Sequence, residues 1–428
     1  MARRQDHREQ LEALQRLFEN QHPALYLARR LFSEASPTAR RALINNLAVN
    51  TTLVGGVTRR AREAAGLGAP VLIVISPTMR CNLRCYGCYA GEYASTEDMS
   101  LELMDRIITE GKDIGVYLYT ISGGEPFIRR DLLDLYAQHN DCEFLVYTNG
   151  TLIDDSVAER LAELGNVGPA ISVEGFEEET DGRRGKGTWK KIMAAMDRLH
   201  EAGVIFGFSG TVTRHNANLI SSEALVDLMI EKGCFFGWYF MYIPIGRKPD
   251  ISLMPTPEQR RKCGDRVEQY RATKPIFVAD FWNDGLLTRG CMAGGRLYLH
   301  VTTSGWVEPC VFAHFTADNI RDKSLEEILD SKFFRAIRRR FPWSENHLTP
   351  CAIIDNPWVL RGAVAEAGAR PSHPGAETIL TDLAPHLDQY SAEMKTLTEP
   401  RWEAILAEQK RTGKDALGVS LTDEVAAH

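Results

Sequence analysis

The stretch Cys81-Asn82-Leu83-Arg84-Cys85-Tyr86-Gly87-Cys88 comes directly after an apolar, β-branched run from Val71 to Ser76. Its C-x3-C-x2-C spacing places three thiols on one short loop at the end of a predicted strand. Three cysteines cannot ligate every metal of a four-iron cube, so one iron is left without a protein ligand. An open position of this kind is typical of a reactive metal site and not of a closed structural one.

A zinc site is the alternative for these three cysteines. Zinc ligands usually occur as C-x2-C pairs with a fourth ligand nearby. No His or Cys follows Cys88 within about twenty residues. The spacing therefore favours a [4Fe–4S] cluster, with a zinc-stabilised scaffold as the alternative.

Composition limits the class of protein. The chain has 428 residues, of which 44% are hydrophobic and 25% charged, as in ordinary globular proteins with room for two or three domains or one large barrel. A net charge of −7 argues against nucleic acid as a partner. No apolar run is long enough to span a bilayer, and no signal-peptide core follows the first residues. Nine cysteines without such a signal suggest metal ligation in a reducing, cytoplasmic setting.

Short β-like runs alternate with amphipathic, helix-like segments from Pro70 to Ile245. The β-like runs are Val71–Thr78, Val116–Ser122, Glu143–Thr148, Gly168–Val173, Ile205–Val212 and Phe235–Ile243. The helix-like segments between them are Ser100–Lys112, Arg130–His139, Asp154–Leu164, Thr188–Ala202 and Asn218–Glu231. This α/β pattern predicts a partial (β/α)6 TIM-like barrel, with the chemistry at the carboxyl ends of its strands.

We divide the chain into four parts. An N-terminal helical segment covers residues 1–69, the barrel 70–250, a small C-terminal auxiliary-cluster domain 251–365, and a helical tail 366–428. The N-terminal segment has eleven Arg and six acidic residues, and an apolar stripe of Leu11, Leu14, Leu17 and Phe18. One interpretation is that this segment packs across the bottom or open side of the barrel. The other is that its basic face contacts an anionic membrane peripherally.

A second motif, Ser122-Gly123-Gly124-Glu125-Pro126, lies at the end of the second predicted strand. One βα unit after the cysteine motif, it makes the barrel resemble the radical S-adenosylmethionine (SAM) enzymes. The resemblance implies that SAM chelates the open iron and is cleaved by one electron to a 5′-deoxyadenosyl radical, which removes hydrogen from a substrate. It also implies that Glu125 accepts hydrogen bonds from the SAM amino group, with the backbone of Gly123 and Gly124 close by.

Other SAM contacts follow from the resemblance alone. Ser172 and Glu174, in Ser172-Val173-Glu174-Gly175, resemble a family segment near the SAM ribose. Arg184 matches the position of an arginine near the methionine carboxylate. Ordinary turn residues are the alternative for Ser172 and Arg184. Weaker candidates for SAM contacts are Thr148-Asn149-Gly150, Thr213 and Tyr242.

The motif departs from the family at one position. The residue before the third cysteine is commonly aromatic and stacks near the adenine, but here it is Gly87. We expect Tyr86 or Tyr89 to fill that space.

Cys291, Cys310 and Cys351 form a second candidate metal site. A predicted hairpin, Tyr298–Val301 with Val307–Val311, brings Cys291 and Cys310 together. The pattern C-x13-G-x4-C resembles the opening of the auxiliary-cluster regions called SPASM and twitch, which implies a second [4Fe–4S] cluster. Candidates for its fourth ligand are Asp355, His314, Cys263 or none, in which case one iron is open. Zinc or ordinary buried cysteines are the alternatives.

The function expected from the sequence is a radical SAM oxidoreductase or transferase. It would receive electrons from a donor such as flavodoxin or ferredoxin and act on a peptide, a lipid or isoprenoid, or another metabolite. The alternative is a non-catalytic iron–sulfur electron carrier or redox sensor, which would leave Glu125, Ser172 and Arg184 without a role.

Overall fold

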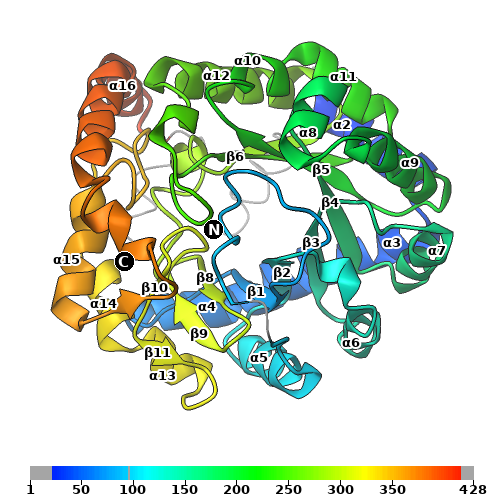
Figure 1. Ribbon diagram of the computed structural model, residues 1–428, viewed down its shortest axis with the longest axis horizontal. Coiled ribbons are helices and arrows are strands. Elements are labelled where there is room, and N and C mark those ends of the chain that lie inside the picture. Colours follow the sequence, from blue (N-terminus) through cyan, green and yellow to red (C-terminus); the bar gives the residue numbers. More distant parts are fainter. Residues whose placement is uncertain (1–21, 95–96, 416–428) are drawn as a thin grey trace, which may run out of the picture.

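The computed structural model describes residues 22–94 and 97–415 (Figure 1). The predicted apolar stripe of residues 11–18 and the end of the predicted tail lie outside these ranges.

A single sheet organises the molecule, with the strand order β11-β9-β8-β1-β2-β3-β4-β5-β6-β7. The strands from β8 to β7 in this order all run parallel, and β9 and β11 are antiparallel additions at one edge. Their bounds are β1 Leu72–Thr78, β2 Leu118–Gly123, β3 Glu143–Thr148, β4 Val167–Val173, β5 Gly207–Val212, β6 Phe236–Met241, β7 Phe277–Asp280, β8 Tyr298–Val301, β9 Trp306–Glu308 and β11 Asp318–Asn319. A separate pair joins β10 Phe315–Thr316 to β12 Arg370–Pro371.

The six predicted strands are confirmed, and helices cover the outside of the sheet in Figure 1. The helices of this part are α5 Leu101–Asp113, α6 Leu132–Gln138, α7 Asp155–Leu164, α8 Glu177–Arg184, α9 Thr188–Glu201, α10 Ala217–Ile220, α11 Glu223–Glu231 and the short η2 Pro126–Ile128. Ser100 caps α5, because its side chain accepts a hydrogen bond from the Leu103 N–H. The apolar faces of these helices pack on the sheet and form the core.

The predicted auxiliary region adds strands to both edges of the barrel sheet. β8 pairs with β1, with Leu72 opposite Tyr298, while β7 pairs with β6. The predicted hairpin is present as β8 and β9. The remaining elements are α12 Pro257–Thr273, η3 Ile251–Leu253, η4 Asp284–Leu286, α13 Leu325–Leu329, α14 Lys332–Arg338, α15 Pro357–Ala367, η5 Ala376–Leu380 and α16 Ala384–Thr412.

The N-terminal helices lie across the amino ends of the strands. They are α2 Pro23–Glu34, α3 Pro37–Leu43, the π-helix η1 Ile44–Val54 and α4 Gly55–Ala64. The Asn46 amide donates to the carbonyl of Cys142 at 3.0 Å, just before β3, and Arg59 donates to the Gly115 carbonyl at 2.6 Å, just before β2. These contacts support the interpretation that the segment packs across the bottom of the barrel. Since the strands are parallel, the cysteine loop after β1 lies at the opposite end.

Candidate active site and metal centres

The cysteine loop is fixed to the end of β2 by backbone hydrogen bonds. Gly124 N–H donates to the Thr78 carbonyl and Glu125 N–H to the Arg80 carbonyl, each at 2.8 Å. A Cβ on Gly124 would lie 2.2 Å from the Arg80 carbonyl oxygen. Glycine is therefore required here by the close approach of the cysteine loop itself.

The Glu125 carboxylate is fully buried and joins the ends of β2 and β3. It accepts hydrogen bonds from the Thr148 hydroxyl at 2.7 Å, the Asn149 N–H at 2.7 Å and the Phe127 N–H at 3.1 Å. Burial raises its pKa, and these donors act in the opposite direction. A carboxylate offers about four acceptor positions, so a further donor such as an amino group can still be accommodated.

The turn after β3 also holds the cysteine loop. The Asn149 amide donates to the Asn82 side chain at 2.8 Å and lies 3.9 Å from the Cys81 sulfur. Asn82 in turn donates to the Thr151 hydroxyl at 2.8 Å. The segment Thr148-Asn149-Gly150, a weaker candidate for a SAM contact, therefore positions the first cysteine.

A buried charge cluster follows β4. One oxygen of Glu174, Oε1, accepts from Arg183 at 2.6 Å and from Arg184 at 2.5 and 2.8 Å. Burial acts to lower the pKa of Arg184, but Glu174 outweighs it and the pKa is raised. Two residues predicted to contact SAM separately are thus paired with each other. Arg183, which sequence reasoning missed, also donates to the carbonyls of Tyr86 and Gly87 at 3.3 and 3.4 Å.

Three thiols therefore share one loop, which residues from the ends of β2, β3 and β4 support. Burial is the main cause that raises the pKa of the Cys81 and Cys88 thiols, and the other loop cysteines raise it further. The second carboxylate oxygen of Glu174, Oε2, is buried and has no hydrogen-bond partner within the described ranges. A buried, unpaired acceptor beside the loop suits a ligand hydroxyl, as expected for a ribose. The residues present fit the expected cluster and nucleoside.

Gly87 lies against the ring of Tyr242, one of the weaker candidates for a SAM contact. A Cβ on Gly87 would lie 2.7 Å from the ring of Tyr242, which comes from the segment after β6. Tyr86 is 45% exposed, and Tyr89 lies with its hydroxyl 2.5 Å from that of Ser122. Tyr242 is therefore the aromatic neighbour of this glycine, a contact that spacing along the sequence cannot reveal.

Ser172, at the end of β4, is half-buried, with its hydroxyl 3.4 Å from that of Ser209 on β5. It lies on the strand that leads to Glu174. A ribose contact by Ser172 stays a prediction.

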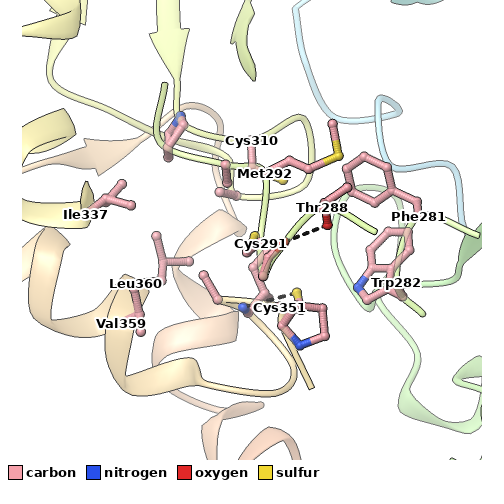
Figure 2. Close-up of a pocket in the computed structure, with 17 residues that line it drawn as sticks. Phe281, Trp282, Thr288, Cys291, Met292, Cys310, Ile337, Cys351, Val359 and Leu360 are labelled. Atoms are coloured by element: carbon pink, nitrogen blue, oxygen red, sulfur yellow. Dashed lines mark hydrogen bonds between the residues drawn. The ribbon is translucent and has the colours of Figure 1, made fainter. Parts of the chain in front are cut away.

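Cys291, Cys310 and Cys351 come together around an apolar pocket. Figure 2 shows their side chains among Phe281, Trp282, Ile337, Val359 and Leu360. Burial raises the pKa of the Cys310 thiol to about 12. The pocket places three thiols in a mostly apolar setting, which suits a low-potential cluster.

The three candidates for a fourth ligand do not line this pocket. Asp355 forms a fully buried ion pair with Arg260, with contacts of 2.6 and 3.0 Å. His314 has one ring nitrogen 2.7 Å from His373 and the other 3.0 Å from the Val311 carbonyl. Cys263 lies on the buried face of α12. No group of three or more His, Cys, Asp or Glu in the described part of the chain is arranged to hold a single metal ion.

A series of aromatic side chains in contact links the two cysteine sites. Tyr89, next to Cys88, contacts Phe312 with ring centroids 5.4 Å apart. Phe312 contacts Trp282, in the wall of the second pocket, at 4.9 Å. Phe240 on β6 lies 6.1 Å from Phe312 and 5.4 Å from Tyr147 on β3. The group Tyr89, Tyr147, Phe240, Phe281, Trp282 and Phe312 is called the aromatic group below.

A buried polar chain joins the cysteine loop to the β8–β9 hairpin. Tyr93 donates to Glu308 at 2.6 Å, and the other oxygen of Glu308 is 2.7 Å from His300 Nδ1. His300 Nε2 lies 2.8 Å from the Ser76 hydroxyl on β1. Burial acts to raise the pKa of Glu308, but the hydrogen bond and charge of His300 outweigh it, and this pKa is lowered. Sequence reasoning missed this chain, because Ser76 and His300 are 224 residues apart.

Comparison with known proteins supports both metal centres. A family model described as the radical SAM superfamily matches residues 75–228, and one described as an iron–sulfur cluster-binding domain, SPASM, matches residues 291–352. Mycofactocin maturase MftC from Mycolicibacterium smegmatis is 31% identical, over 68% of this chain and 79% of the relative. Fe-coproporphyrin III synthase from Methanosarcina barkeri is 26% identical, over 66% of this chain and 79% of the relative.

A solved structure shares the fold. Streptococcus suis SuiB bound to the precursor peptide SuiA superposes with a TM-score of 0.54 at 19% identity, covering 65% of this chain and 69% of that one.

Proposed function

The chain belongs to the radical SAM superfamily, as an enzyme with a SPASM region, and on this premise we propose which of its residues bind the cofactors and where the substrate lies. Cys81, Cys85 and Cys88 would ligate a [4Fe–4S] cluster that binds SAM, and Cys291, Cys310 and Cys351 an auxiliary cluster. When bound, the first cluster and SAM supply the 5′-deoxyadenosyl radical that removes hydrogen from the substrate. The chain's own work is to orient these groups and to exclude water.

The convergence of three strand ends on the cysteine loop is the observation that carries this proposal. Glu125 has room for one more donor, which we assign to the SAM amino group, with Gly123 and Gly124 fixing its position. The unpaired Oε2 of Glu174 is assigned to a ribose hydroxyl. Arg184, held against Glu174, adds positive charge near the loop for the methionine carboxylate.

We place the substrate at the aromatic group, between the two cysteine sites. Aromatic side chains favour apolar and planar groups, through burial and through ring contacts. We therefore propose that the reacting part of the substrate is aromatic or extended and apolar. A peptide side chain, an isoprenoid or a planar metabolite would all present such a group.

Anaerobic reconstitution with iron and sulfide, followed by SAM and dithionite, tests the function. The wild-type chain should form 5′-deoxyadenosine, and Cys85→Ala should reduce this product to background. Cys234→Ala is the matched control, since this buried cysteine precedes β6 at the amino ends of the strands, where its carbonyl accepts from Arg30 at 3.0 Å, and the variant should remain active. An electron carrier would oxidise and reduce reversibly without forming 5′-deoxyadenosine, which would reject the proposal.

The enzyme needs a reductant, and a flavodoxin or ferredoxin is the donor we propose. Replacing dithionite with a reduced flavodoxin or ferredoxin should sustain 5′-deoxyadenosine formation. Failure of both proteins, while dithionite remains effective, would reject this donor class.

We also propose that the N-terminal helices contact an anionic membrane. Within the described ranges no helix is both long and apolar enough to cross a bilayer. The outer face of η1 and α4 nevertheless exposes Ile44, Leu53 and Val57 at 50%, 62% and 62%. The exposed Arg41 lies at the end of α3, directly before η1, and the exposed Arg60 lies on α4. Apolar side chains beside arginines match the surface of a membrane with anionic lipids.

Vesicle flotation tests this contact. Vesicles with phosphatidylglycerol should carry the protein upward, and the double variant Leu53→Gln, Val57→Gln should reduce the bound fraction severalfold. Leu406→Gln is the control: it replaces an exposed leucine on α16, away from this face, and should leave binding unchanged. Equal flotation of all three proteins would reject the assigned face. Because this face lies at the amino ends of the strands, the cysteine loop would point away from the membrane.

A further inference from the structure

One sulfur of the second metal site receives a hydrogen bond from a tyrosine. The Tyr298 hydroxyl donates to the Cys310 sulfur at 2.7 Å, and both residues are buried. The Phe312 N–H donates to the same sulfur at 3.4 Å. Cys310 therefore has a strong side-chain donor in addition to a backbone donor.

The other predicted ligands have weaker partners in the described structure. The Cys351 sulfur accepts from the Ile353 N–H at 3.3 Å. At the first site the Cys81 sulfur accepts from the Leu83 N–H at 3.5 Å and lies 3.9 Å from the Asn149 amide. The hydroxyl donor distinguishes the second site from the first.

Tyr298 is held firmly in the donating position. It opens β8, where it pairs with Leu72 of β1, and its ring packs edge-on against Phe281 at 5.8 Å. A tyrosine hydroxyl carries its proton at neutral pH, so it acts as the donor toward a thiolate, which has no proton to give.

We propose that Tyr298 is a positioning residue that raises the reduction potential of the auxiliary cluster. Reduction adds one electron to a cluster ligated by thiolates, and a hydrogen bond to a ligand sulfur stabilises this added negative charge. The surrounding apolar pocket acts in the opposite direction, because it disfavours charge. The hydroxyl therefore partly offsets the effect of burial. This inference rests on the auxiliary cluster of the proposed function but not on SAM cleavage.

An EPR-monitored redox titration of the reconstituted full-length protein tests the inference. Adding SAM alters the signal of the SAM-binding cluster only, so the auxiliary signal can be followed separately. Tyr298→Phe removes the hydroxyl and keeps the ring, and it should shift the auxiliary midpoint potential to a more negative value. Tyr239→Phe is the matched control, because its buried hydroxyl donates to the Ile220 carbonyl at 2.9 Å, away from both sites. The auxiliary midpoint potential of Tyr239→Phe should equal that of the wild type.

A second replacement covers the case in which Tyr298→Phe fails to retain its cluster. Difluorotyrosine at position 298 keeps the shape and strengthens the donor, so the potential should become less negative than in the wild type. An unchanged auxiliary potential in Tyr298→Phe at full iron content, or no upward shift with difluorotyrosine, would overturn the inference. Absence of 5′-deoxyadenosine in every sample would instead reject the proposed function and leave the potential measurement valid.

Discussion

At the residue scale, Glu143 makes folding stability depend on pH. It lies at the start of β3, at the bottom of the barrel, where burial raises its pKa from 4.5 to about 8. The Asn46 amide opposes this only weakly, at 3.5 Å. The folded chain therefore keeps a proton that the unfolded chain releases above pH 4.5. The stability linked to this proton is complete below pH 4.5 and is lost as the pH rises to about 8.

Glu143→Gln imitates the protonated carboxyl and should remove this dependence. At pH 8 the variant should be more stable than the wild type by about 2 kcal/mol, whereas near pH 4 the two should be similar. Denaturant unfolding at both pH values measures the difference. Parallel stability curves for the two proteins across this range would show that Glu143 does not titrate as stated.

Sequence predicted the cysteines and Glu125 because each belongs to a short local motif. Their supporting residues were not predictable in the same way. Arg184, which the resemblance places near the methionine carboxylate, is also paired with Glu174, and Arg183 carries the contact to the cysteine loop. Such pairings depend on which side chains the turn after β4 brings together, and no local spacing encodes them.

At the scale of elements, Gly124, directly after β2, allows this turn to touch the cysteine loop. A Cβ on Gly124 would meet the backbone of Met79 and Arg80, at 2.7 and 2.2 Å. Backbone atoms cannot rotate away, so Gly124→Ala should displace the cysteine loop. We expect loss of iron from the first site and a fall in SAM cleavage of ~100-fold, as for misplaced reacting groups.

Gly182→Ala is the control for this change. Gly182 lies inside α8, and a Cβ there would meet nothing within 4 Å. Alanine should stabilise the helix by about 0.5–1 kcal/mol without affecting iron content. Iron analysis and thermal unfolding of both variants separate the two effects. Retention of full iron by Gly124→Ala would show that the loop tolerates the side chain.

Strands and helices with clear periodicity were predictable, and those without it were not. The six barrel strands are buried β-branched or aromatic runs, which explains why their positions were found. Helix α8 was missed because Glu177–Arg184 is almost entirely charged and has no apolar face. Its stability comes from the turn that begins it and from Glu174, which binds its last two arginines.

At the scale of the whole molecule, one sheet carries both metal centres. β8 lies beside β1, so the hairpin that leads to Cys310 continues the sheet that leads to Cys81. The chain Tyr93–Glu308–His300–Ser76 joins the same two elements through side chains. The sequence predicts an auxiliary-cluster domain over 251–365 but not that its strands join the barrel sheet. Pairing between strands so far apart in the chain leaves no local signal. The distance between the two sites is therefore set by the pairing of β8 with β1, and not by a flexible linker.

A fully buried ion pair between Arg260 and Asp355 also joins distant segments of the chain. It joins α12 to the segment after Cys351, where Asp355 also accepts from the Cys351 N–H at 2.9 Å. Asp355→Ala leaves a buried guanidinium without its partner, so we expect a loss of about 3–5 kcal/mol in the free energy of unfolding. The auxiliary site should lose its iron, while the SAM-binding site keeps its cluster, because Asp355 supports only the former.

The double variant Arg260→Met, Asp355→Leu removes both charges and should recover most of the stability. Equal iron loss from the two sites in Asp355→Ala would contradict this separation, and EPR with and without SAM distinguishes the outcomes.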